Sequence, residues 1–239
     1  MEILPIAILI ITIAFLAEST FGFGGGLIAI PFLSLFLGVR DAVTLSLIFQ
    51  FLMGILIIKT YKTIDWKAAL PMTVGIILGT LFGTYGLFSV DEVLLRKFLA
   101  IFILLFLAKT LIDKNLSVTQ SFQKQFSFAA GAVGGLFQGM IGTGGPILTS
   151  YLSVLIKGKD ILRATLMYLF FVTSIVRIFI SLATGLFNPT VITMAIPTMP
   201  FFFLAIILGS YAHKKIEEQR YQYSIYVLLL FAAILLLLK

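Results

Sequence analysis

Two glycine-rich stretches, Gly22-Phe23-Gly24-Gly25-Gly26 and Gly142-Thr143-Gly144-Gly145-Pro146, interrupt long apolar runs of this 239-residue chain. An offset of 120 residues aligns the two stretches, and the same offset aligns Glu18 with Gln138. Glycine destabilises a helix interior and permits backbone angles that other residues avoid, so several glycines together indicate a helix break. In hydrocarbon such a break survives only where protein or a water-filled cavity satisfies its backbone groups.

The composition around these stretches is that of a membrane protein. Hydrophobic residues make up 60% of the chain and charged residues 11%, and the mean hydropathy is +1.14. A soluble domain has about 45–50% apolar and about 25% charged residues, which excludes a soluble enzyme, a disordered chain and a secreted disulfide scaffold. Long apolar runs disfavour a membrane barrel, whose strands alternate. The sequence therefore predicts an all-α polytopic membrane protein.

Ten apolar segments are separated by polar or glycine-rich breaks. They cover residues 3–17, 23–37, 42–58, 68–88, 94–112, 127–140, 146–156, 161–184, 190–211 and 222–238. A full span needs about 20 residues, so the third to fifth and the eighth to tenth segments are long enough to cross. The shorter pairs at 3–37 and 127–156 are expected to be glycine-broken or re-entrant.

A repeat follows from the aligned glycines. Residues 1–112 form the first predicted membrane repeat, 113–126 a polar cytoplasmic linker, and 127–239 the second repeat. Each half has five segments, which is an odd number, so the two halves are expected to insert with opposite orientation. Inverted repeats of this kind are common among secondary transporters.

The basic residues predict the orientation in the plasma (inner) membrane. Crossing at every segment puts twelve Lys and Arg on one side and four on the other. The larger group comprises Lys59, Lys62, Lys67, Lys109, Lys114, Lys124, Lys157, Lys159, Arg163, Lys214, Lys215 and Arg220. Basic loops are retained in the cytoplasm, so that side is predicted to be cytoplasmic and both termini non-cytoplasmic.

The breaks are also the predicted binding site. The helices that follow them, near Leu27 and Pro146, would direct unpaired N–H groups and the positive end of the helix dipole at a cavity, which favours an anion. Nearby hydroxyl groups add donors: Ser19, Thr20, Thr143, Thr149 and Ser150. The alternative is a small-residue packing face between helices.

Four further polar residues lie in or beside apolar runs. Glu18 is the candidate proton-coupling carboxyl if it lies at membrane depth, and a solvated loop residue if it lies at headgroup level. Arg177 lies inside 161–184, and its planar fork suits an oxyanion; the alternatives are a pair with Glu18, capture of backbone carbonyls, or snorkelling. Gln50 and Gln138 either contact substrate or bridge helices.

The residues Gly22-Phe-Gly-Gly-Gly-Leu-Ile-Ala-Ile-Pro31 and Gln138-Gly-Met-Ile-Gly-Thr-Gly-Gly-Pro146 resemble the sulfite exporter TauE/SafE family over nearly the whole chain. Gly22, Gly24, Gly25, Gly26 and Pro31 match its first motif, and Gly142, Gly144, Gly145 and Pro146 its second. A departure lies at Tyr151, where the second copy lacks the proline of the first. The resemblance implies a plasma-membrane permease for small sulfur-containing anions such as sulfite or sulfonates.

The expected function is therefore a proton-coupled secondary transporter working by alternating access. An anion channel and a non-transporting scaffold subunit are the alternatives. An enzyme is not expected, because the aspartates fall at predicted loops or span ends and His213 is the single histidine. With no cysteine, neither a metal nor a cofactor is implied. The expected partners are the anion and the bilayer, with a homo-oligomer left open and no nucleic acid.

Overall fold

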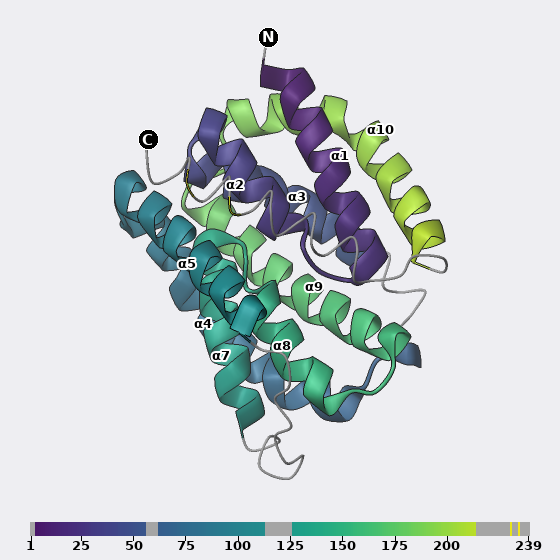
Figure 1. The fold of residues 1–239 in the computed structure, drawn as a ribbon. Helices are drawn as coiled ribbons and strands as arrows, with labels where there is room; N and C mark the ends of the chain where they lie inside the picture. The colour runs from purple at the N-terminus through teal and green to yellow at the C-terminus, as the bar shows by residue number, and fades with distance from the viewer. Residues whose placement is uncertain (1–2, 56–61, 113–125, 214–229, 231–233, 235–239) are drawn as a thin grey trace.

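The computed structural model describes residues 3–55, 62–112, 126–213, 230 and 234, and these form a bundle of α-helices without a strand (Figure 1). The helices are α1 (Ile3–Phe21), α2 (Gly25–Leu37), α3 (Val39–Ile55), α4 (Trp66–Ser89), α5 (Glu92–Ile112), α7 (Ser127–Ile141), α8 (Gly145–Leu155), α9 (Lys159–Ala183) and α10 (Pro189–Ala212). The all-α prediction is confirmed for this part of the chain.

Four of the described helices, α1, α4, α9 and α10, are long and apolar enough to cross a membrane. The expected spans at 68–88, 161–184 and 190–211 correspond to α4, α9 and α10. Segment 42–58 corresponds to α3, which has 17 residues in the described part, and 94–112 to α5. The tenth segment, 222–238, lies outside the described residues except for Leu230 and Ile234.

The prediction for the first segment was too short. The segment was expected to end at residue 17, but α1 continues through Glu18 to Phe21 and has 19 residues. Polar Glu18 does not end the helix because its side chain is buried, at 3% exposure, instead of reaching solvent. The first break therefore follows a helix of spanning length, and the short helices are α2, α7 and α8.

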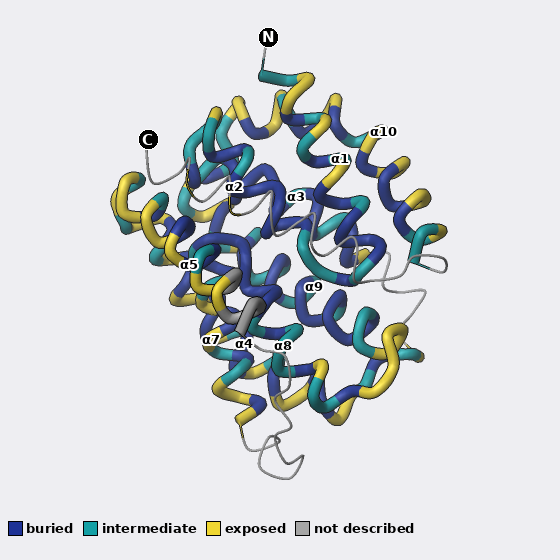
Figure 2. The backbone as a smooth tube through the Cα atoms, viewed as in Figure 1, coloured by how far each residue is buried: buried dark blue, intermediate teal, exposed yellow. Residues whose placement is uncertain are grey.

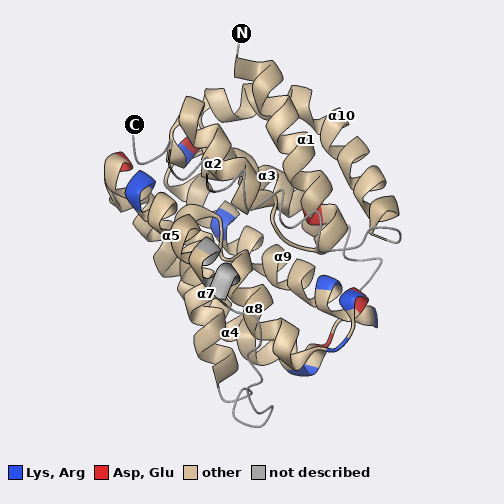
Figure 3. Ribbon diagram, in the orientation of Figure 1, with Lys and Arg blue, Asp and Glu red and all other residues tan. Residues whose placement is uncertain are grey.

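The outside of the bundle is apolar. Large side chains such as Phe82, Phe179 and Ile207 are about two-thirds exposed or more, and exposed positions follow the outer faces of the helices (Figure 2). Charged side chains are sparse and lie mostly near helix ends and loops (Figure 3). A contiguous apolar exterior of this kind fits a lipid environment, since soluble proteins seldom expose such areas.

The two halves of the chain pack across one another. α1 lies along α10, and α7 lies along α4 (Figure 1), so the helix before each break packs on a long helix from the other half. The offset of 120 residues also relates the first residues of α2 and α8, Gly25 and Gly145, and those of α3 and α9, Val39 and Lys159. The repeat and its inversion in the membrane stay predictions.

The contact between α4 and α7 consists largely of glycine. Glycines at every fourth position of α4 face backbone carbonyls of α7, and glycines of α7 face carbonyls of α4: Gly75, Gly79 and Gly83, and Gly131, Gly135 and Gly139. A Cβ on Gly79 would overlap the carbonyl of Ala132. Small residues at this spacing let helix backbones approach closely, which is how membrane helices associate without a hydrophobic driving force.

Candidate functional site

The two breaks have nearly the same local geometry. Gly22 and Gly142 adopt left-handed backbone angles, with φ of 83° and 68°, which glycine tolerates without a Cβ penalty. Their N–H groups donate to the carbonyl oxygens of Glu18 and Gln138 at 2.7 and 3.0 Å. The copies differ at the helix caps, because Gly24 has φ of 108° whereas its counterpart Gly144 has −75°.

The side chains of Glu18 and Gln138 accept hydrogen bonds from backbone N–H groups of the breaks. The Gln138 Oε1 atom accepts a hydrogen bond from the Gly144 N–H at 2.7 Å, and the Glu18 carboxylate accepts one from the Gly25 N–H. Both side chains are buried. Each therefore satisfies one of the N–H groups that a helix start leaves unpaired, which explains why a polar residue lies four positions before each break.

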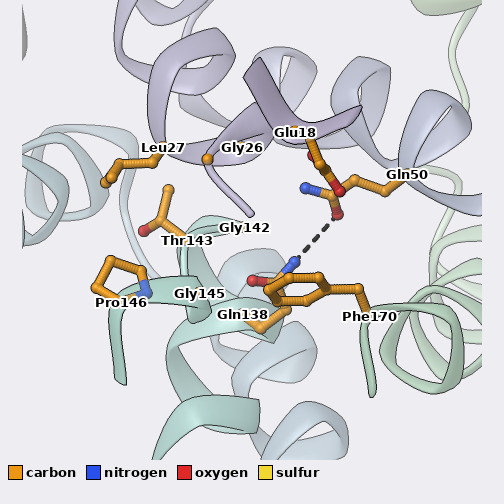
Figure 4. A pocket seen from close by; sticks show the side chains of 11 residues that line it. Glu18, Gly26, Leu27, Gln50, Gln138, Gly142, Thr143, Gly145, Pro146 and Phe170 are labelled. Carbon is orange, nitrogen blue, oxygen red and sulfur yellow. Dashed lines mark hydrogen bonds between the residues drawn. The ribbon is translucent and has the colours of Figure 1, made fainter. Parts of the chain in front are cut away.

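The breaks meet. A Cβ on Gly26 would overlap the carbonyl oxygen of Gly142 and would crowd the Nε2 atom of Gln50. Side chains and backbone from both breaks surround one cavity (Figure 4), lined by Glu18, Gly24, Gly26, Leu27, Gln50, Gln138, Gly142, Thr143, Gly145, Pro146 and Phe170. About 240 Å³ is not filled by protein atoms, but the open part admits only about one water molecule. In this conformation the site is therefore too narrow for an ion larger than a water molecule.

A chain of polar side chains extends from the cavity into the protein. The Oε1 atom of Gln50 accepts hydrogen bonds from Gln138 Nε2 at 3.1 Å and from Arg177 Nη1 at 2.9 Å (Figure 4 shows the first). Arg177 Nη2 donates to the Val43 carbonyl at 3.3 Å. Gln50 thus joins the second break, α3 and α9 through one oxygen atom.

Arg177 lies behind the cavity wall. It is 1% exposed, so it does not snorkel, and among the described residues it forms no ion pair with Glu18. Its Nη2 atom would lie 3.6 Å from a Cβ on Gly142, which places the guanidinium beside the second break. Its Nε–H finds no hydrogen-bond partner in the described part of the chain. The guanidinium group therefore contacts Gln50 and lies beside Gly142, and both of these residues line the cavity.

The remaining predicted residues divide into two groups. Thr143 lines the cavity, and its buried Oγ1 atom has no partner among the described residues. Ser19 and Thr20 instead contact α10: the Ser19 hydroxyl donates to the Ile206 carbonyl at 2.9 Å, and the Thr20 hydroxyl lies 3.3 Å from the Gly209 carbonyl. Gly22 packs against the stem of Arg163.

Two lining residues, Leu27 and Phe170, were not among the site residues predicted from the sequence. Phe170 is separated from Gln50 by the repeat offset of 120, so the repeat itself could have pointed to it. Leu27 was expected only as the start of a helix; α2 begins two residues earlier, at Gly25. Within the described residues, no group of three His, Cys, Asp or Glu side chains could hold a metal ion.

Comparisons with known proteins agree on a transporter family. The family described as sulfite exporter TauE/SafE matches residues 7–236. A probable membrane transporter protein of Methanocaldococcus jannaschii is 30% identical over 163 residues, which are 61% of this chain and 60% of that protein. The match thus spans about three-fifths of that relative's length. No solved structure matches the chain.

Proposed function

The chain belongs to the sulfite exporter TauE/SafE family of membrane transporters, and from that premise we propose that it is a secondary transporter for small sulfur-containing anions such as sulfite or organosulfonates. The observation that carries the proposal is the meeting of the two glycine breaks at one buried cavity. Paired half-helices around a central site are typical of secondary transporters.

The chemistry of the cavity favours an anion. The first turns of α2 and α8 both border it, so helix N-termini contribute N–H donors and positive partial charge from two directions. Thr143 offers a hydroxyl that has no other partner in the described part of the chain, and the Gln50 amide group faces Gly26. Arg177 supplies a full positive charge behind Gln50. A small oxyanion has several acceptor oxygens, which suits donors that converge in this way.

Glu18 supports proton coupling. Its carboxyl lines the same cavity, and an ionised carboxylate there would repel a bound anion. Protonation removes that repulsion, so proton and anion would occupy the cavity together more readily than the anion alone. In this proposal Glu18 takes a proton from the side where the anion enters and releases it on the other side.

The size of the site supports alternating access. Space for about one water molecule cannot hold an anion with three or four oxygens, so the walls must separate to load it. In this proposal one half moves against the other, opening the cavity toward one side at a time. We place the chain in the plasma membrane, with the loop before α9 in the cytoplasm and the termini outside.

An uptake panel in proteoliposomes tests the proposed function. Sulfite, sulfate, thiosulfate and short sulfonates are each offered with and without a pH gradient. We expect saturable uptake of at least one sulfur-containing anion, faster when the entry side is more acidic. If none of these anions enters faster than in protein-free liposomes, the proposed function is wrong. Uptake that rises linearly without saturation would support the channel alternative.

A further inference from the structure

A second cavity lies on the other side of the first break from the central one. Its walls come from the end of α1, the first break, the middle of α8, the start of α9 and the residue after α10, and it contains about 540 Å³ not filled by protein atoms. The lining residues are Thr20, Phe21, Phe23, Thr149, Lys159, Leu162 and His213. It admits several water molecules, so it is wider than the central site.

The cavity is adjacent to the central site. Phe23 lines it, and a Cβ on Gly145, which lines the central cavity, would lie 3.6 Å from the Phe23 Cβ. Gly145 and Thr149 both belong to the short helix α8, so this one helix borders both cavities. Phe23 therefore lies at the boundary between the two cavities.

Two basic side chains, Lys159 and His213, line the cavity. Both ring nitrogens of His213 face oxygen acceptors: Nδ1 lies 2.6 Å from the Thr20 carbonyl and Nε2 lies 2.9 Å from Asp160 Oδ1. The Asp160 carboxylate thus lies within ion-pairing distance of the His213 ring. Lys159 Nζ reaches only the His213 carbonyl, at 3.5 Å, and among the described residues it forms no ion pair.

A donor without a partner points to the same ligand chemistry. The Thr149 Oγ1 atom is buried and has no hydrogen-bond partner within the described part of the chain. An ammonium group and a hydroxyl donor across a hydrated cavity can both bind an oxyanion. Charged residues of both signs also gather where α9 begins (Figure 3).

We infer that this cavity, between Lys159 and Thr149, is an entry site where a small oxyanion binds before it passes Phe23 into the central cavity. The inference deepens the proposed function and rests on it. Lys159 attracts the anion, Thr149 donates a hydrogen bond to it, and Phe23 closes the passage.

Thiol labelling tests the entry site without requiring transport. The chain has no cysteine, so Thr149→Cys places a single thiol in the cavity. The purified variant in nanodiscs is treated with two thiosulfonate reagents, one bearing a sulfonate group and one bearing a trimethylammonium group. We expect the anionic reagent to react faster, by roughly fivefold or more, because Lys159 attracts it across the cavity.

Two further variants provide the decisive comparison. Adding Lys159→Gln is expected to bring the ratio of the two rates close to one, because the fold loses only a 3.5 Å contact while the cavity loses its charge. Adding Lys157→Gln, an exposed lysine that does not line the cavity, is the matched control and leaves the ratio unchanged. An unaltered ratio after Lys159→Gln, or no reaction with either reagent, overturns the entry site.

Transport kinetics separate this inference from the function on which it rests. In proteoliposomes with sulfite, Lys159→Gln is expected to raise KM severalfold with little change in the maximal rate, while Lys157→Gln matches the unaltered protein. A lowered maximal rate at unchanged KM contradicts an entry role. If the unaltered protein moves no anion of the panel but the labelling ratio behaves as expected, the cavity binds anions and the transport proposal alone fails.

Discussion

Glu18 and Gln138 perform the same local task with different chemistry. Each side chain accepts a hydrogen bond from a backbone N–H group at the start of the helix after its break. Only Glu18 can also bind and release a proton. A glutamine at position 18 would keep the acceptor oxygen, as Gln138 demonstrates at the second break. Structure and proton coupling can therefore be separated at this one residue.

The variant Glu18→Gln is expected to fold, to transport, and to lose the dependence of uptake on pH. The measurement is the initial rate of sulfite uptake into proteoliposomes over a series of external pH values. Glu92→Gln is the matched control, because the Glu92 carboxylate accepts the Val39 N–H at a helix start away from the cavity. Retained pH dependence in Glu18→Gln, equal to that of the control, would refute a proton-coupling role.

We expect that lysine cannot replace Arg177 without loss of transport. Its two Nη atoms donate to Gln50 and to the Val43 carbonyl, a fork that one ammonium group cannot reproduce. A hydrogen bond to a charged group contributes about 1.5–3 kcal/mol, so Arg177→Lys should lower uptake by about tenfold or more. Arg96→Lys on α5 serves as the control. Normal uptake by Arg177→Lys would show that the forked geometry is dispensable.

At the residue level, the sequence was most informative where local chemistry alone decides the structure. The glycine clusters predicted both breaks, and Glu18, Gln50 and Gln138 were expected at the site that they line. Ser19 and Thr20 were expected there too, but they face α10. Successive helical residues point about 100° apart, so proximity in sequence to Glu18 could not determine which face of α1 meets the cavity.

At the level of elements, the glycine contact between α4 and α7 is a close helix packing that the sequence did not predict. Glycines at four-residue spacing are visible in both segments, but spacing does not identify which helices pair. Pairing depends on how distant segments meet. The length of α1 was missed for a similar reason, since only tertiary burial reveals that Glu18 continues the helix.

A matched pair of alanine substitutions within α4 tests this contact. A Cβ on Gly79 overlaps the Ala132 carbonyl, whereas one on Gly86 lies 3.7 Å from the Met140 side chain, an ordinary contact. We expect Gly79→Ala to destabilise the protein by about 1–3 kcal/mol through overpacking. Gly86→Ala should be neutral or stabilise by about 0.5–1 kcal/mol. Thermal unfolding in detergent measures both, and equal melting temperatures would contradict the close approach of α4 and α7.

For the whole molecule, the central prediction is the orientation of the halves. Asp91 lies between α4 and α5, at the end where Arg40 donates to the carbonyls of Phe88 and Val90. Lys157 lies at the other end, before α9. Single-cysteine variants Asp91→Cys and Lys157→Cys should react differently with a membrane-impermeant thiol reagent in intact cells.

The thiol at position 91 is expected to be labelled from outside, and the thiol at 157 only after the cells are opened. The reason is the excess of basic residues on the Lys157 side, which holds those loops in the cytoplasm. A reporter after Lys239 should likewise be non-cytoplasmic. The reverse labelling pattern would overturn the predicted orientation, and a cytoplasmic reporter would mean that the number of crossings differs by one.

Counter-flow of radiolabelled sulfite in proteoliposomes tests most directly whether the two breaks form one transport site. Liposomes loaded with unlabelled sulfite should take up the label faster than empty ones. Gly26→Ala, whose Cβ would push into the Gly142 carbonyl at the point where the breaks meet, should abolish that acceleration while the protein elutes as a single folded species. Absence of counter-flow in the unaltered protein, or full counter-flow in Gly26→Ala, would contradict a carrier built on this site.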